Sequence, residues 1–326
     1  MLEAQHVLRD VRRMDLRKQL ETLTTEKINP AFGSIDQMST LELATLMNSE
    51  DAKVPEAISN VLPSIAESVD AIAARMAEGG RLIYTGAGTA GRIGVLDAVE
   101  CIPTFNTSVG EVIGLIAGGA GAMMLAVEGA EDNPSLAEAD LKSLKLSTSD
   151  TVVGISASGR TPYAVGSLAY AKKIGALTVG LSCNRDSELC ANADHRIEVI
   201  VGAELVAGST RLKAGTAQKL VCNMLSTLTM IKLGKTYGNL MVNLRTTNKK
   251  LIARSYHIVK EATGGSEDEV LFHGVNEALD YFQGDVKCAI VALLSGNRQK
   301  AQKALDDANG RVRDALQLLN KNSTAR

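Results

Sequence analysis

Hydrophobic residues change their spacing near residue 80 of the chain. Before it they recur at helical spacing, as in Ile58, Leu62, Ile65, Val69, Ile72 and Met76, which predicts a long helix over 54–76. After it, short apolar runs alternate with helix-like stretches. The predicted strands are 82–84, 112–116, 151–155, 177–181 and 197–201, and the predicted helices between them are 91–98, 121–129, 135–144 and 162–174. This alternation predicts an α/β fold, a parallel sheet with helices on both faces.

The chain on either side of this region is expected to be mostly helical. Ser39 and Glu42 have the spacing of a capping box at a helix start. The tail contains an echo, because GDVKCAI at 284–290 resembles GRVRDAL at 310–316, so we expect short helices that each follow a glycine. The remaining predictions are a helix-prone arm at 1–20, a loop at 24–36 and helices at 211–233 and 239–263. As domains we expect an N-terminal arm and helices (1–60), an α/β domain (61–236), a connecting helix (237–263) and a small helical module (264–326).

Composition narrows the class of protein. The 326 residues are 45% apolar and carry a net charge of −2, which argues against a general nucleic-acid binder. No run approaches the roughly 18 apolar residues of a membrane span, and the first 20 residues lack the apolar core of an export signal. Five cysteines form no metal-binding spacing, so we expect reduced thiols in the cytoplasm.

A glycine-rich turn, GAGTAGR at 86–92, follows the first predicted strand and precedes a helix. Glycines let the backbone approach a ligand, and the free N–H groups of a helix start favour an anion. A dinucleotide site would need an acidic residue at the end of the next strand, but that strand ends in AGG at 117–119. The turn is therefore either an anion site or a purely structural turn.

A second loop, SASGRT at 156–161, repeats the plan with hydroxyl groups. Ser156, Ser158 and Thr161 surround Gly159, and such hydroxyls with successive N–H groups form a phosphate-binding nest. The alternative is a hydroxyl-capped helix start. Two such loops in one chain favour a single phosphate held between them.

Three acidic residues follow predicted strands near these loops. Glu100 lies in DAVECIPTF, where Pro103 is expected to end the helix, and Glu128 and Glu131 lie in VEGAED. Each alone would be an ordinary surface acid, but their positions make them candidates for chemistry. The four histidines show no metal-ligand spacing. The segment STRLKAGTAQK at 209–219 either adds positive charge over an anionic substrate or is an ordinary helix start.

Together these residues resemble the N-acetylmuramic acid 6-phosphate etherases. The resemblance runs from about Thr24 to about Leu319. The matching stretches are IDQMSTLE (35–42), GGRLIYTGAGTAGRIGVLDAVEC (79–101), IAGG (116–119), AVEGAED (126–132), SASGRTPY (156–163), STRLKAGTAQKL (209–220) and GNLMVN (238–243). The resemblance implies a sugar isomerase (SIS) domain, a tail similar to ubiquitin-associated modules, and a homodimer with its site near the subunit interface. It also implies a sugar-phosphate substrate and no metal or organic cofactor.

The resemblance also implies roles for individual residues. It assigns the chemistry to Glu100 and Glu131. The phosphate-loop residues of the family fall on Gly88, Thr89, Gly91, Ser156, Ser158, Gly159 and Thr161. Beside the resemblance, we add Glu128 as a substrate-site candidate, because its charge would raise the proton affinity of Glu131. The chain departs from the family at Ala90, where a serine is usual, and at Val99 and Ile102, where serine and proline are usual. Loss of the serine hydroxyl would remove a hydrogen bond to the phosphate, a loss of about 1.5–3 kcal/mol of binding.

The family reaction would replace the D-lactyl ether of the sugar with a hydroxyl group. We hypothesise that Glu131 removes the proton on C2, and that Glu100 protonates the departing lactate and then activates water. Glu100 must start protonated, so we expect it to be buried beside Val99 and Ile102. Two alternatives remain: an aldose–ketose isomerase with the same phosphate grip, and a non-catalytic sugar-phosphate sensor. The presence of both glutamates favours the etherase.

Overall fold

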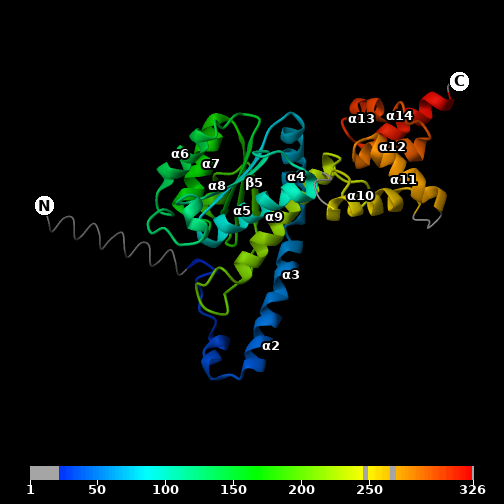
Figure 1. Ribbon diagram of the computed structural model, residues 1–326. Helices are drawn as coiled ribbons and strands as arrows, with labels where there is room; N and C mark the ends of the chain where they lie inside the picture. Colours follow the sequence, from blue (N-terminus) through cyan, green and yellow to red (C-terminus); the bar gives the residue numbers. More distant parts are fainter. Residues whose placement is uncertain (1–21, 245–248, 265–268, 325–326) are drawn as a thin grey trace, which may run out of the picture. The chain divides into compact units, whose positions relative to one another are not determined.

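The computed structural model describes residues 22–244, 249–264 and 269–324 (Figure 1). The arm expected at 1–20 lies outside the described residues. The chain forms two compact units, Met1–Ala98 with Gly110–Leu225, and Val99–Val109 with Ser226–Arg326. No helix in the described ranges combines the length and the apolar character needed to cross a bilayer.

The helices before the sheet begin as the sequence predicts but are shorter. The capping box is confirmed, because the Ser39 N–H donates to Glu42 Oε2 (2.8 Å) at the start of α2 (Thr40–Asp51). The single helix expected over 54–76 is wrong. It is two helices, α3 (Lys53–Ser59) and α4 (Leu62–Ala77), because Pro63 disfavours a helical conformation just before it. The predicted loop at 24–36 contains two short 3₁₀ helices, η1 (Pro30–Phe32) and η2 (Ile35–Gln37).

A five-stranded parallel sheet forms the centre of the first unit, as predicted. The strand order is β2-β1-β3-β4-β5. The strands are β1 (Leu82–Gly86), β2 (Val112–Ile116), β3 (Thr151–Ser156), β4 (Leu177–Ser182) and β5 (His195–Glu198). Gly86 pairs with Ile116 on one side and Ile155 on the other, so three neighbouring strands end at the same level. Ligands bind at this edge in open parallel sheets.

Helices cover both faces of the sheet, as two successive residues of β1 demonstrate. Ile83 packs in one cluster with Leu141 of α6 (Pro134–Ser143) and Leu168 of α7 (Pro162–Ile174). Tyr84 points to the opposite face, where its hydroxyl donates to Asp97 of α5 (Gly88–Phe105) at 2.8 Å and to the Cys222 carbonyl of α9 (Lys213–Lys232) at 3.3 Å. The first unit also contains the short helix α8 (Glu188–Ala191). Helices α5 and α9 both begin in this unit and continue past its boundary into the second unit.

One predicted helix of this region is wrong. Residues 121–129 were expected to be helical, but only η3 (Ala120–Met123) forms there. Gly118 and Gly119 both have positive φ angles, 89° and 74°, so the backbone after β2 turns instead of entering a helix. Glu128 and Glu131 therefore lie on turns and do not share a helix face.

An ion pair between the half-buried Arg81 and the buried Asp150 joins the starts of β1 and β3. The Arg81 guanidinium donates to both carboxylate oxygens of Asp150 (2.9 and 2.7 Å), and the Arg81 backbone N–H donates to the same group (3.0 Å). Burial alone would raise the pKa of Asp150. Hydrogen bonds from Arg81 and from Ser147 outweigh burial and hold the pKa below its usual value.

The second unit ends in a set of short helices, as predicted. They are α10 (Lys249–Ala262), α11 (Glu269–Tyr281), α12 (Val286–Ser295), α13 (Ala301–Asp307) and α14 (Val312–Thr324). The helix predicted over 239–263 is therefore too long, because Leu240 pairs with Tyr237 in an isolated β-bridge and the described helix begins at Lys249. The domain boundaries at 60, 236 and 263 stay predictions.

The sequence echo in the tail corresponds to two identical turns. Gln283 and Asn309 have φ angles of 52° and 51°, and the following glycine N–H donates to the carbonyl five residues back, at 2.7 Å in both turns. Lys287 joins two segments of this unit, because its ammonium donates to the carbonyls of Gly234 (3.0 Å) and Gly310 (2.9 Å). Burial, with a contribution from Lys235, lowers the pKa of Lys287 to about 8.

Candidate functional site

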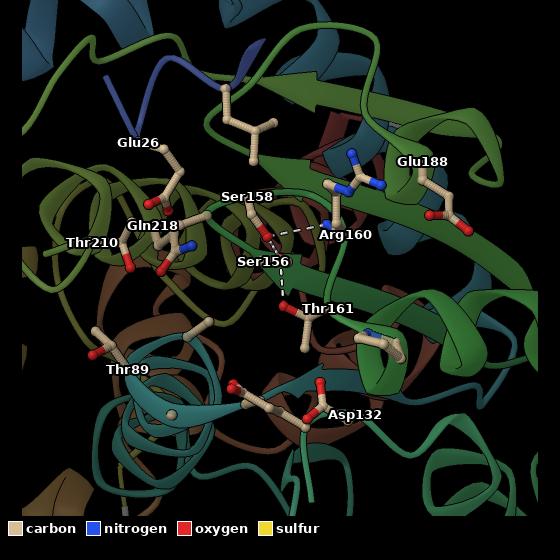
Figure 2. Close-up of a pocket in the computed structure, with 17 residues that line it drawn as sticks. Glu26, Thr89, Asp132, Ser156, Ser158, Arg160, Thr161, Glu188, Thr210 and Gln218 are labelled. Atoms are coloured by element: carbon tan, nitrogen blue, oxygen red, sulfur yellow. Dashed lines mark hydrogen bonds between the residues drawn. The ribbon is translucent and has the colours of Figure 1, made fainter. Parts of the chain in front are cut away.

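The principal cavity lies beyond the carboxyl ends of β1 and β3, where the sequence places both loops. Its volume is about 730 Å³. Figure 2 shows the side chains around it. The lining residues are Leu23, Glu26, Ala87, Gly88, Thr89, Ala90, Glu131, Asp132, Ser156, Ala157, Ser158, Arg160, Thr161, Pro162, Glu188, Thr210 and Gln218.

The hydroxyl loop after β3 is held by its own side chains. Ser156 Oγ lies 2.8 Å from Thr161 Oγ1 and 3.2 Å from Ser158 Oγ, and it accepts from the Gly159 N–H (3.0 Å). The Arg160 N–H donates weakly to Ser158 Oγ (3.3 Å). Three hydroxyl groups thus converge on one wall of the cavity, in the arrangement expected of a phosphate nest.

Gly159 does not line the cavity but fixes the shape of this loop. Its φ is +70°, and a Cβ at this position would lie 2.3 Å from Ser187 Cβ. Ser187 in turn caps α8, accepting from the Cys190 N–H (3.2 Å). Only glycine fits here, because any side chain would push the loop away from α8.

The first loop brings β1 into the start of α5 through close backbone contacts. A Cβ on Gly91 would lie 2.6 Å from the Gly86 carbonyl oxygen, so the turn closes only with glycine at that position. Gly91 therefore shapes the loop without lining the cavity, whereas Gly88, Thr89 and Ala90 line it. Ala90 presents no hydroxyl to the cavity at the position where the resemblance leads us to expect one.

Glu131 lines this cavity and also a smaller neighbouring one of about 290 Å³. Glu128 lines the smaller cavity, together with Arg92, and is not among the described residues that line the main one. The Arg92 guanidinium donates to the carbonyls of Met123 (3.0 Å) and Ala122 (2.7 Å), which fixes the loop that leads to Glu128. Glu131 thus stands where an acidic side chain can reach a ligand in the main cavity.

Glu100 occupies a different position from the one expected. Helix α5 continues through Pro103 to Phe105, so Glu100 lies within a helix and not at a turn. It is exposed, and Val99 and Ile102 are 56% and 43% exposed, so the expected burial among them is wrong. Glu100 is also not among the described residues that line the cavity.

Acidic side chains outnumber basic ones in the lining of the cavity. Glu26, Glu131, Asp132 and Glu188 line it, against Arg160 as its single basic residue in the described part of the chain. An anion here would be held by N–H groups and hydroxyls more than by cationic side chains. The described residues contain no group of three or more His, Cys, Asp or Glu arranged to hold a metal ion.

Several lining residues were not predicted. Leu23 and Glu26 come from the N-terminal segment, which is tied to the loop after β4 because the Thr24 N–H donates to Asn184 Oδ1 (2.7 Å). Gln218 comes from α9. The signal in the sequence that could have marked it as a site residue is its position in STRLKAGTAQKL (209–220), one of the stretches that match the family. In that stretch Lys213 does not add charge over a substrate, because its buried ammonium pairs with Glu50 (2.8 Å).

Comparison with known proteins matches the chain to two families and to close relatives. Residues 64–172 match the glucokinase regulatory protein N-terminal SIS domain, and residues 133–228 match the SIS domain. A phosphoheptose isomerase structure from Francisella tularensis is 15% identical with a TM-score of 0.45, covering 58% of this chain and 100% of that chain.

The relatives are similar over nearly their whole length, and all three are named N-acetylmuramic acid 6-phosphate etherase. The Streptomyces coelicolor protein is 61% identical over 303 residues, covering 93% of this chain and 96% of its own. The proteins of Pectobacterium atrosepticum and Clostridium beijerinckii are 54% and 53% identical, each covering 91% of this chain and 97% of its own. The chain therefore belongs to the N-acetylmuramic acid 6-phosphate etherase family.

Proposed function

We propose that this protein cleaves the D-lactyl ether of N-acetylmuramic acid 6-phosphate, giving N-acetylglucosamine 6-phosphate and D-lactate. The observation that carries the proposal is that three converging hydroxyls and Glu131 line the same cavity, in a chain 61% identical to a named etherase. The cavity volume of about 730 Å³ is that of an ordinary small-molecule site.

The phosphate of the substrate would bind between the two loops. Ser156, Ser158 and Thr161 offer hydroxyl donors, and the start of α5 at Gly88 and Thr89 offers free N–H groups. This places the 6-end of the sugar against β1 and β3. The carbons that react, C2 and C3, would then lie further into the cavity, whose lining includes Glu131.

The reaction is an elimination followed by an addition. Opening of the sugar ring makes C1 an aldehyde, which acidifies the proton on C2. Glu131 takes that proton, the C3–O bond breaks, and lactate leaves as its oxygen receives a proton from Glu100. Water then adds to C3 of the unsaturated aldehyde while C2 is protonated again, so the net change is hydrolysis of the ether.

Glu100 would act in the cavity of a second copy of the chain. It follows Thr89 by eleven residues in the same continuous helix, about 16 Å along the axis, whereas C3 of the sugar is only a few bonds from the phosphate. Leu96, Val99 and Ile102 succeed one another at three-residue spacing on α5 and are 51%, 56% and 43% exposed. An apolar stripe of this kind favours a protein interface, so we propose a homodimer that covers it.

Subunit complementation tests this arrangement. Glu100→Ala and Glu131→Ala are each expected to slow lactate release by about 10²- to 10⁴-fold. In a co-expressed heterodimer of the two variants, one site would combine Glu131 of one chain with Glu100 of the other, restoring about half of the wild-type rate. If Glu100 served its own chain, no heterodimer site would be complete and the activity would stay low.

Product analysis separates the etherase from its alternatives. Wild-type protein incubated with N-acetylmuramic acid 6-phosphate should release D-lactate. A ketose phosphate product without lactate would indicate an aldose–ketose isomerase, and binding without turnover would indicate a sensor. We also propose that the protein works in the cytoplasm, since all five cysteines lie in the described residues, are buried and form no disulfide.

A further inference from the structure

A buried carboxamide in the cavity wall has no partner. Gln218 is 1% exposed, yet neither its Nε2 nor its Oε1 has a hydrogen-bond partner among the described residues. Buried polar atoms without partners are rare, because losing water without gaining a protein partner is costly. Among the described residues with buried, unpartnered side-chain atoms, Gln218 is the one that lines the cavity. Both polar atoms of its side chain lack a hydrogen bond.

The position of Gln218 follows from the packing of α9 against the first loop. A Cβ on Gly215 would lie 3.3 Å from Thr89 Cγ2, so the first turn of α9 rests on the first turn of α5. Gln218 is three residues further on and lies on the same side of α9. Figure 2 shows its carboxamide among the side chains around the cavity, on the same side of the view as Glu26 and Thr210.

The chemistry of a carboxamide restricts what it can bind. Nε2 donates and Oε1 accepts, so both atoms are satisfied only by a ligand that offers an acceptor and a donor close together. A phosphate dianion or a carboxylate offers acceptors only and would leave Oε1 without a partner. An acetamido group has both, but its trans geometry points the N–H and the carbonyl in opposite directions. The hydroxyl groups on C4 and C5 of the ring-opened sugar phosphate meet the requirement, because C2 carries the acetamido group and C3 the lactyl ether.

The geometry points to Gln218 as a substrate-binding residue that pairs with neighbouring hydroxyl groups of the sugar phosphate. This inference rests on the proposed function, which supplies the sugar phosphate. It adds a neutral contact to a site whose other assigned groups hold the phosphate or carry out the chemistry. The carboxamide would fix the carbon chain between the phosphate loops and Glu131.

Replacing Gln218 with methionine tests this inference. Methionine keeps the size of the side chain and removes both polar atoms. We expect Gln218→Met to raise KM for lactate release about 10- to 100-fold, the range for leaving hydrogen-bonding groups unpaired, with kcat changed much less. Without ligand, its thermal midpoint should equal or exceed that of wild type, because no protein hydrogen bond is lost. Gln218→Glu keeps the acceptor and loses the donor, so its KM should also rise.

The same substitution at an exposed position serves as the control. Gln317→Met in α14 should leave KM and kcat unchanged. The product N-acetylglucosamine 6-phosphate serves as a second probe, because it keeps the hydroxyl chain and lacks the lactyl group. Its inhibition constant should rise with KM in Gln218→Met.

Each other outcome overturns the inference. A wild-type KM in either Gln218 variant excludes a substrate contact. Failure of both variants to fold would mean that the carboxamide supports the structure, for example through a second copy of the chain. A raised KM with an unchanged inhibition constant for the product would assign Gln218 to the lactyl group instead. Absence of lactate release by wild-type protein would instead refute the proposed function itself.

Discussion

The backbone N–H of Tyr163 donates to the backbone carbonyl of Glu131 at 3.0 Å. Tyr163 lies in the first turn of α7, directly after the hydroxyl loop, and is fully buried with its own hydroxyl bonded to Asp140 (2.6 Å). The exposed turn that carries Glu131 is therefore attached to the rigid element that forms the phosphate wall. This attachment sets the distance between the proposed base and the bound phosphate.

Isotope exchange distinguishes the roles of the two glutamates. In heavy water, Glu100→Ala protein should exchange the C2 proton of the substrate without releasing lactate, because Glu131 still removes that proton. Glu131→Ala protein should do neither. General acid–base groups contribute about 10²- to 10⁴-fold to a rate, so losses of that size are expected for both. NMR measures the exchange. Exchange at C2 by the Glu131→Ala protein would refute the assignment of Glu131 as the base that removes the C2 proton.

Gly159→Ala should damage the hydroxyl loop. The new Cβ would lie 2.3 Å from Ser187 Cβ, so the loop or the cap of α8 must move, and KM for the substrate should rise. Gly202→Ala is the matched control, because φ is +74° but no atom lies within 4 Å of its Cβ. The control should cost only the conformational strain of about 1–2 kcal/mol and leave KM unchanged. Thermal unfolding and steady-state kinetics measure both, and equal effects would contradict the role of Gly159.

Asp150→Ala should destabilise the first unit and alter its acid unfolding. Removing the carboxylate takes away the charged partner of Arg81, which keeps only backbone carbonyls, and the acceptor of the Ser147 N–H, at a cost of about 3 kcal/mol. The pKa of Asp150 is below its usual value when folded, so its contribution is present above pH 4 or so and is lost as pH falls through the lowered pKa. The stability difference between the proteins should therefore shrink in acid. Glu138→Ala, at an exposed ion pair, should show little effect at any pH.

Lys287 should make the second unit more stable in alkali. Its folded pKa of about 8 lies below the usual value of 10.5, so the unfolded chain holds the proton more tightly. The penalty for burying the charge is complete below pH 8 and is relieved as pH rises from 8 to 10.5. Relative to the Lys287→Met variant, the wild-type protein should thus gain stability between pH 8 and 10.5. Thermal unfolding of both proteins across this pH range measures the difference. A constant difference across the range would show that the ammonium is not significantly desolvated.

The parallel sheet and both loops could be predicted because local patterns determine them. Apolar runs of strand length alternate with helical spacing, and the glycines at 86, 91 and 159 stand where neighbouring atoms of the folded chain leave no room for a side chain. The break between α3 and α4 was missed because a continuous apolar stripe outweighed Pro63 in the prediction. The missing helix at 121–129 shows the reverse case, in which positive φ at Gly118 and Gly119 outweighs helix-prone neighbours.

The site was predictable only in part. The phosphate loops have recognisable glycine and hydroxyl patterns, whereas Gln218 lies in a helix whose periodicity does not distinguish a cavity wall from a core. The expected burial of Glu100 failed for another reason. Burial beside Val99 and Ile102 is a tertiary or quaternary property, and neighbours in sequence on a helix do not enclose one another.

The acidic lining of the main cavity has a consequence for the working conditions of the protein. Dipoles of N–H and O–H groups act over short range and are little affected by dissolved ions, whereas attraction between formal charges weakens as ionic strength rises. A phosphate ester held mainly by Ser156, Ser158, Thr161 and the start of α5 should therefore not lose affinity in concentrated salt, because screening weakens the repulsion from the acidic lining. Selection among competing anions would then depend on shape and hydrogen bonding, and the many phosphorylated metabolites of a cell would be rejected by fit.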